Sequence, residues 1–185
     1  MTQRHLVQIV ASGPDSEWQS IMQAYFSAIA TAEQYVYIST PYFLPNESIM
    51  TALKTAALSG VDVRVILPDK NDSWIVGKSS RSYLEELLES GAKVYFYLKG
   101  FTHSKLMIVD DVFASVGTAN MDIRSFNQDF EANALIYDEG IAAQLKHDFM
   151  EDVANSKEIT PAEWEKRPRI EKAQESVARI FSPLL

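Results

Sequence analysis

Apolar residues along the chain follow two different periods, and each period predicts one type of secondary structure. Strands are expected where β-branched, aromatic or alternating apolar residues cluster, at residues 6–11, 35–39, 61–67, 93–98, 105–109, 112–116 and 131–137. Helices are expected where apolar residues recur every three or four positions, at residues 15–32, 46–59, 73–90, 139–154, a short stretch after 161, and 169–181. The chain is thus expected to alternate between strands and helices.

Polar residues and glycines mark the ends of several of these elements. Asn46 suits the N-cap of one helix, and Asp15 or Ser16 suits that of another, because their side chains accept hydrogen bonds from free helix N–H groups. Gly60 and Gly91 follow two expected helices and favour the left-handed conformation that ends a helix. Local chemistry therefore supports the boundaries that periodicity indicates.

The order of the elements favours an α/β fold. Strands separated by helices tend to pair in parallel, whereas the two strands joined at Asp110-Asp111 predict an antiparallel hairpin. With 185 residues, the chain has the size of one domain. We therefore expect a single domain over residues 1–185, with a mixed β-sheet of about seven strands flanked by helices on both faces.

The last expected helix carries an apolar stripe that has two interpretations. The stripe repeats at i, i+3, i+7 and i+10 and consists of Ile170, Ala173, Val177 and Ile180. Basic residues lie beside it, at Arg169, Lys172 and Arg179. The simpler expectation is that the stripe packs on the core of its own domain. The alternative is that it docks a membrane or a partner protein.

Composition and charge narrow the classes of function. The absence of cysteine excludes disulfides and thiolate metal sites. No stretch reaches the roughly 18 apolar residues of a membrane span, so the chain as written is expected to be soluble. The formal net charge is −8, and no basic footprint for nucleic-acid binding is visible. A nucleic-acid partner is therefore not expected.

One motif carries the candidate chemistry: His103, Lys105 and Asp110 in the pattern H-x-K-x4-D, with Asn120 in a small polar segment behind it. Side chains alternate along a strand, so residues 103 and 105 should point the same way. An imidazole and an ammonium aimed at one spot suit nucleophilic attack on an anionic phosphoryl group. A lone histidine is more often a surface residue, but its neighbours make a catalytic site the better interpretation.

Three further residues have expected roles around this pair. Asp110 lies at the hairpin tip, where a role in holding the turn is more plausible than proton transfer. Asn120 can donate its amide N–H to a phosphoryl oxygen. Glu131 lies among apolar strand residues, where a half-buried carboxylate needs a partner, and a histidine Nδ1–H would satisfy it. That hydrogen bond would leave Nε2 free to attack.

The motif H-x-K-x4-D followed by G-T-x-N resembles the HKD signature of the phospholipase D superfamily. Flanking words narrow the resemblance to the bacterial cardiolipin synthase family. These words are T-P-Y-F-L-P at 40–45, S-G-V-D-V-R at 59–64, G-T-A-N-M-D-I-R-S-F at 117–126 and F-S-P-L-L at 181–185. The likeness extends over essentially the whole chain and implies a phospholipase D-like α/β sandwich.

The resemblance also implies what the chain does and where. Members of the family usually carry membrane-spanning helices and two HKD halves that share one active site. This chain resembles the second half alone, so a partner half or a homodimer is implied. The implied reaction needs no cofactor or metal: two phosphatidylglycerols give cardiolipin and glycerol through a phosphohistidine. The parent protein is expected at the cytoplasmic side of the bacterial inner membrane, in contact with its surface.

For the site residues, the resemblance implies that His103 is nucleophile or general acid, that Lys105 and Asn120 bind phosphate, and that Glu131 orients a histidine. The identity of the phosphatidyl acceptor stays open between phosphatidylglycerol, phosphatidylethanolamine and water. Two alternatives remain: a homodimeric phosphodiesterase or nuclease of the same superfamily, and a non-catalytic half that docks a membrane or a partner.

Overall fold

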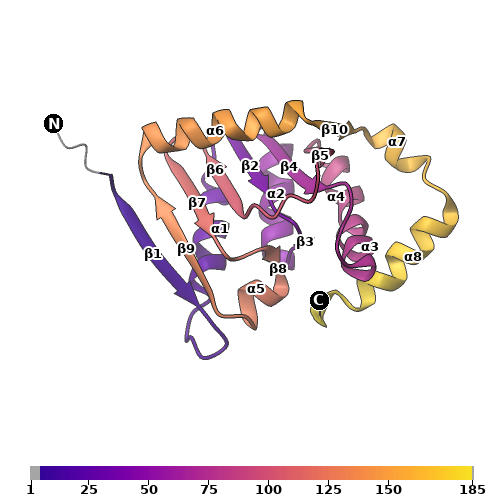
Figure 1. Cartoon of the computed structure of the whole chain (residues 1–185), viewed down its shortest axis with the longest axis horizontal. Coiled ribbons are helices and arrows are strands. Elements are labelled where there is room, and N and C mark those ends of the chain that lie inside the picture. Colours follow the sequence, from indigo (N-terminus) through magenta and orange to yellow (C-terminus); the bar gives the residue numbers. More distant parts are fainter. Residues whose placement is uncertain (1–4, 185) are drawn as a thin grey trace.

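The structure, a computed structural model, describes residues 5–184 and is built on one large mixed β-sheet (Figure 1). The eight strands of this sheet lie in the order β1 (Val7–Ser12), β9 (Glu131–Ile136), β7 (Phe113–Gly117), β6 (Leu106–Val109), β2 (Tyr35–Ser39), β4 (Asp62–Pro68), β5 (Lys93–Tyr97) and β10 (Ser156–Ile159). The pairs β2–β4 and β4–β5 are parallel, and all other neighbours are antiparallel. The α/β class and the mixed sheet are confirmed.

The sheet has one strand more than the seven expected. The additional strand is β10, which pairs with β5 at the edge of the sheet. Three of its four residues, S-K-E-I, are polar, and it lies in an expected gap between helices, so periodicity did not indicate it. A separate short parallel ladder joins β3 (Phe43–Leu44) to β8 (Met121–Asp122).

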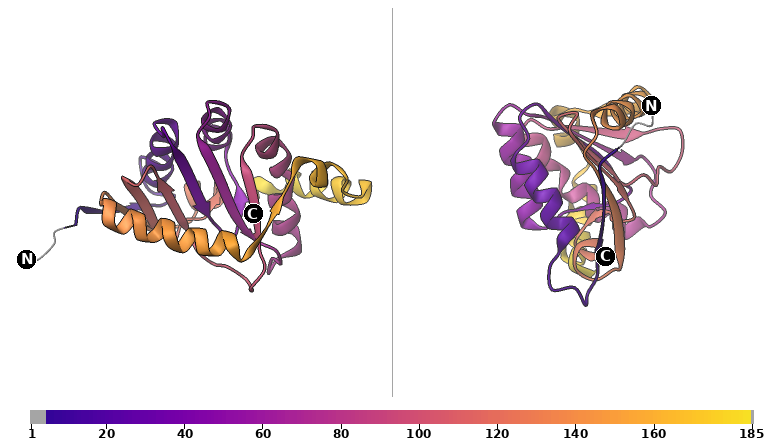
Figure 2. Two further views of the ribbon diagram at one scale, coloured as in Figure 1. Left: turned by 90° about the horizontal axis from the view of Figure 1, so that it is seen from above. Right: turned by 90° about the vertical axis from the view of Figure 1, so that its left-hand side faces the viewer.

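Helices cover both faces of the sheet, as Figure 2 shows. One face carries α1 (Ser20–Ala30), α2 (Glu47–Leu58), α3 (Trp74–Ser82) and α4 (Leu84–Glu89), and the other carries α6 (Glu139–Ala154). Alternation along β2 divides its side chains between the two layers: Val36 and Ile38 join the larger core, while Tyr37 stacks on Phe149 of α6 at 4.9 Å. Two buried layers therefore hold the central strands.

Two expected helices differ from the prediction. The first begins at Ser20 rather than near residue 15, because Ser16 instead accepts a hydrogen bond from the N–H of Gly13. The helix expected over 73–90 is divided at Tyr83 into α3 and α4. Near this break, the Ser82 hydroxyl donates to the Ser79 carbonyl, which competes with regular helical hydrogen bonding.

The N-cap predicted at Asp15 or Ser16 is wrong, but the other turn and cap predictions are confirmed. Asn46 accepts a hydrogen bond from the N–H of Ile49 at the start of α2. Gly60 and Gly91 have φ angles of +94° and +92°. Asp110 and Asp111 have φ angles of 52° and 56°, the left-handed pair that a two-residue hairpin turn requires.

The C-terminal segment forms an arm along one side of the sheet. It consists of α7 (Pro161–Glu165), α8 (Arg169–Ile180) and the 3₁₀ turn η1 (Ser182–Leu184). A capping box between Thr160 and Glu163 begins α7, and α8 packs on α3. The expectation that the stripe of α8 packs on the core is wrong, because Ile170, Val177 and Ile180 are exposed. Within residues 5–184, no helix is both long and apolar enough to cross a membrane.

Candidate active site

His103 and Lys105 lie together in the loop directly before β6, one residue short of the strand on which they were expected. The loop that follows β5 carries His103, which is exposed, and leads to the partly buried Lys105. Lys105 Nζ lies 3.2 Å from both ring nitrogens of His103 and donates to its carbonyl oxygen at 3.1 Å. The ring of Phe101, on the same loop, lies 5.7 Å from the imidazole. The site thus presents an accessible imidazole with a cation beside it.

Glu131 begins β9, which is separated from β6 by β7, and accepts hydrogen bonds from two hydroxyls. Thr118 Oγ1 donates to one carboxylate oxygen, and Ser125 Oγ donates to the other at 2.9 Å. Among the described residues, His103 makes no hydrogen bond to Glu131, so the predicted carboxylate–histidine contact is not formed within this chain. Each carboxylate oxygen has a second lone pair, and Glu131 therefore retains the capacity to accept from another donor.

The charges around Lys105 influence its protonation. Partial burial is the largest cause and lowers the pKa of Lys105, while the negative charges of Glu131 and Asp122 act in the opposite direction. Asp122 is itself buried, which raises the pKa of its carboxyl group. The ammonium of Lys105 is therefore easier to deprotonate than that of a fully solvated lysine, and two carboxylates help to keep it charged.

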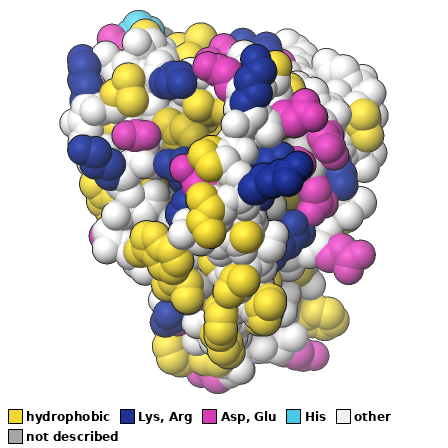
Figure 3. Space-filling model, turned by 90° about the vertical axis from the view of Figure 1, so that its right-hand side faces the viewer, with side chains coloured by type: hydrophobic (Ala, Val, Ile, Leu, Met, Phe, Trp, Pro, Cys, Tyr) yellow, Lys and Arg dark blue, Asp and Glu magenta, His cyan; other side chains and the backbone are white. Residues whose placement is uncertain are grey.

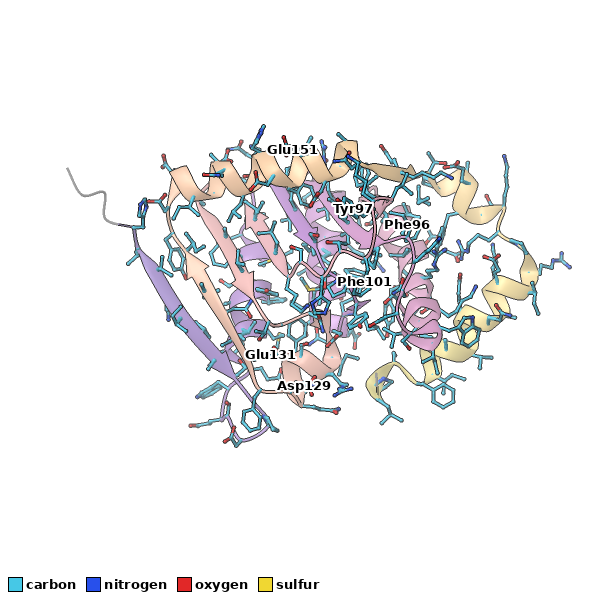
Figure 4. All side chains as sticks on the ribbon, viewed as in Figure 1. Phe96, Tyr97, Phe101, Asp129, Glu131 and Glu151 are labelled. Atoms are coloured by element: carbon cyan, nitrogen blue, oxygen red, sulfur yellow. The ribbon has the colours of Figure 1, made fainter. Side chains whose placement is uncertain are left out.

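Asn120 approaches the same region from the loop between β7 and β8. Its backbone N–H donates to Ser125 Oγ at 3.1 Å, and its side-chain Oδ1 is buried with no partner among the described residues. Asn120 lines a hollow of about 260 Å³ that is also bordered by Tyr42, Asp122, Arg124, Asp129 and Leu184. Figure 4 shows Glu131 and Asp129 below Phe101, far from Glu151 of α6.

A buried polar network holds the loop that carries Thr118 and Asn120. Asn133 accepts a hydrogen bond from the N–H of Ala119, and its amide donates to Tyr25 at 2.8 Å and to Ser115 at 2.9 Å. Burial raises the pKa of Tyr25 to about 12, so its hydroxyl stays protonated. The loop is therefore anchored by neutral groups in the core.

Gly117 provides the close approach that this anchoring needs. A Cβ atom at position 117 would lie 2.4 Å from both the carbonyl oxygen of Ala132 and Oδ1 of Asn133. Thr118, Ser125 and Asn133 were missed as site residues by sequence reasoning. Two of them lie in the word G-T-A-N-M-D-I-R-S-F, and the spacing of Asp122 to Ser125 is that of an N-cap, which the structure has at α5 (Ile123–Asn127).

Asp110 is separated from the other four candidate residues. It follows the far end of β6, five residues from Lys105, or about 16 Å at roughly 3.3 Å per residue. Its carboxylate accepts hydrogen bonds from the backbone N–H groups of Glu33, Gln34 and Tyr35 at 2.6, 2.9 and 2.7 Å. The motif groups Asp110 with the site, whereas the structure gives it the architectural position expected from the turn.

The other two histidines lie elsewhere. His5 pairs with Asp138 at 2.8 Å, and His147 lies 3.5 Å from Glu151 on α6. Among residues 5–184, no three His, Asp or Glu side chains form a group suited to a metal ion. The imidazole of His103 and the ammonium of Lys105 thus lie beside the loop that carries Asn120 and near the carboxylate of Glu131, a set of groups suited to an anionic phosphoryl group.

Comparisons with known proteins agree with this chemistry. Residues 25–153 match the family model described as cardiolipin synthase, phospholipase D-like domain. The chain is 50% identical over 179 residues to a cardiolipin synthase of Geobacillus sp. and 49% identical to cardiolipin synthase 2 of Bacillus cereus. Each alignment covers 97% of this chain, but only 36% and 35% of the relatives' own lengths. The chain therefore spans about a third of these relatives.

Solved structures share the fold at low identity. The phospholipase D family member Nuc from Salmonella typhimurium has a TM-score of 0.70 at 20% identity, covering 85% of this chain and 99% of its own. Phosphatidylserine synthase from Haemophilus influenzae has a TM-score of 0.77 at 19% identity, covering 97% of this chain and 48% of its own. The family model matches residues 25–153, which is more than half of the chain. The chain therefore belongs to the phospholipase D-like domain family of cardiolipin synthases.

Proposed function

We propose that this chain supplies one HKD half of the active site of a phosphatidyltransferase that makes cardiolipin. The observation that carries the proposal is the exposed imidazole of His103 with Lys105 Nζ 3.2 Å away, beside the loop of Asn120. The identity of about half to curated cardiolipin synthases supports phosphatidylglycerol, an anionic phosphodiester, as the substrate.

The reaction proceeds in two displacements. In the first, a histidine Nε2 forms a bond to the phosphorus of one phosphatidylglycerol, and the bond from phosphorus to the head-group glycerol oxygen breaks. A second histidine gives its proton to the departing glycerol. In the second, that histidine takes the proton of a hydroxyl on another phosphatidylglycerol, whose oxygen attacks phosphorus and releases the first histidine. Covalent catalysis thereby replaces one difficult step with two easier ones.

The remaining residues stabilise and orient. The Lys105 ammonium and the Asn120 amide are suited to hold the non-bridging phosphoryl oxygens as negative charge develops on them. Glu131 orients a histidine by accepting its Nδ1–H, for which it retains lone pairs. Asp110 contributes by holding the hairpin in position. His103 acts as nucleophile or as general acid, depending on which half attacks.

The second histidine must come from outside this chain. His5 and His147 are engaged in separate pairs away from Lys105, so neither is suited to act with His103. The relatives are about three times as long as this chain, and a second HKD half in such a longer protein would provide the second histidine. A second copy of this chain is the other source of that histidine. The longer protein would work at the cytoplasmic side of the bacterial inner membrane.

The test is cardiolipin formation from phosphatidylglycerol in mixed micelles containing EDTA, over a series of protein concentrations. Specific activity that rises with concentration is expected if two copies pair their His103 residues. If the chain is silent alone, adding the missing half should restore transfer. Failure to form cardiolipin in both arrangements would contradict the proposal, and cleavage of plasmid DNA under the same conditions would favour a nuclease.

A further inference from the structure

Helix α8 turns its polar side toward the domain and its apolar side outward. Glu175 and Ala178 are each 2% exposed, whereas Ile170, Val177 and Ile180 are 66%, 58% and 73% exposed. A surface helix normally buries its apolar stripe against the core. The arrangement in α8 is the reverse, so the stripe is left without a partner among the described residues.

Charged contacts, rather than apolar packing, attach α8 to the domain. Arg167 Nη2 donates to Glu175 Oε2 at 3.1 Å, and both side chains are almost fully buried. Arg179 donates to Glu86 at 2.7 Å, and its guanidinium lies 4.3 Å from the ring centre of Tyr83. These contacts fix the rotation of α8 about its axis, and the apolar stripe consequently faces away from the domain.

The exposed apolar surface continues from α8 to the candidate site. After α8 the chain adds Phe181 and Leu184, which are both exposed. Leu184 also lines the 260 Å³ hollow bordered by Asn120 and Tyr42. Figure 3 views the side of the molecule that carries α8 and shows hydrophobic side chains gathered over its lower half. One apolar surface thus reaches from the helix to the hollow beside the site.

Basic side chains lie around the start of α8. Lys166, Arg169 and Lys172 form no ion pair within residues 5–184. They outnumber Glu165 and Glu171 in the same stretch, although the whole chain has a net charge of −8. Lys172 lines a groove with Glu85, Glu86 and Glu89, so the exposed positive charge that favours an anionic surface is that of Lys166 and Arg169.

We propose that the stripe of α8, with Phe181 and Leu184, docks on the surface of an anionic phospholipid bilayer. Amphipathic helices with basic residues lie in the headgroup region in this way. A stable protein interface takes about 20–30 residues from each partner, many more than this stripe offers. The choice of an anionic lipid rests on the proposed function, and docking would bring the hollow beside Asn120 to the substrate.

The test measures binding of the whole chain to sedimented vesicles, either phosphatidylglycerol with phosphatidylcholine or phosphatidylcholine alone. The double variant V177Q/I180Q should lower the partition coefficient about tenfold or more, because two aliphatic side chains no longer enter the lipid. The matched control L58Q/V112Q removes two comparably exposed apolar residues from other surfaces and should leave binding within about twofold of the unmodified chain. K166Q/R169Q should weaken binding to the anionic vesicles alone.

Three outcomes would overturn the proposal. In the first, the unmodified chain does not bind vesicles. In the second, V177Q/I180Q binds vesicles as well as the unmodified chain does. In the third, V177Q/I180Q loses self-association but keeps its vesicle binding. The last would assign the stripe to a protein interface. Binding needs no turnover, so H103A should bind as the unmodified chain does. Stripe-dependent binding without cardiolipin formation would contradict the proposed function while supporting the docking surface.

Discussion

The carboxylate of Asp110 accepts a hydrogen bond of 2.7 Å from the backbone N–H of Tyr35, a residue 75 positions earlier in the chain. The same carboxylate accepts from the N–H groups of Glu33 and Gln34. These bonds tie the hairpin of β6 and β7 to the start of β2, its neighbour in the sheet. Because β6 begins directly after Lys105, the contact also helps to place the candidate site at the other end of the strand.

Replacing Asp110 with Ala should lower the free energy of unfolding by roughly 2–4 kcal/mol, because three backbone N–H groups lose a charged acceptor. Chemical denaturation monitored by circular dichroism measures this loss. The matched variant D110N keeps one acceptor oxygen and tolerates the left-handed backbone, so it should lose less. Equal losses in the two variants would mean that the charge and the second oxygen contribute nothing.

Replacing His103 with Ala should reduce phosphatidyl transfer about a thousandfold or more without changing the melting temperature, since the imidazole is exposed and its proposed role is covalent or acid–base chemistry. Transfer assays and thermal denaturation measure the two effects. H147A is the matched control, because His147 is an exposed histidine on α6. Retained transfer in H103A would refute the proposed mechanism.

Replacing Glu131 with Gln should slow transfer and move the alkaline limb of its pH profile to lower pH. The pKa of Lys105 is already lowered by burial, and the charge of Glu131 opposes that shift. Removing this charge lowers the pKa of Lys105 further, so the ammonium proposed to bind phosphate is lost at a lower pH. The measurement is kcat/KM against pH. K105R should move the limb upward, and an unmoved limb in E131Q would show that the two groups are not coupled.

Replacing Glu175 with Ala should destabilise the chain by roughly 3 kcal/mol, because the guanidinium of Arg167 would stay buried without its closest countercharge. Urea unfolding at neutral pH measures the change. The double variant R167M/E175L removes both charges and should recover most of the lost stability. A double variant as unstable as E175A would indicate that the pair contributes more than mutual neutralisation.

Local sequence predicted several features closely because short-range chemistry decides them. The strand at Tyr35–Ser39 and the helix at Glu139–Ala154 have the predicted bounds, since each has a clear period and clear end signals. The cap at Asn46 and the turn at Asp110 follow from side chains that bond to nearby backbone or tolerate a positive φ. His103 and Lys105 lie close together, as predicted, because they are two residues apart, although both lie in the loop before β6 rather than in the strand.

Contacts made in the assembled fold decided the rest. Thr118 and Ser125, rather than a histidine, bond to Glu131, because the turn from β7 through α5 to β9 brings their hydroxyls to the carboxylate. Strand β10 forms because β5 offers an unpaired edge, which the mostly polar sequence of β10 does not reveal.

The amphipathic character of α8 is visible in its sequence, but the direction of its apolar side is not. The hydrophobic period shows only that the helix has an apolar and a polar side. The buried pair of Arg167 and Glu175 determines which of the two sides faces the domain. Burial of that pair depends on the packing of α8 against α3, and this is a property of the assembled fold.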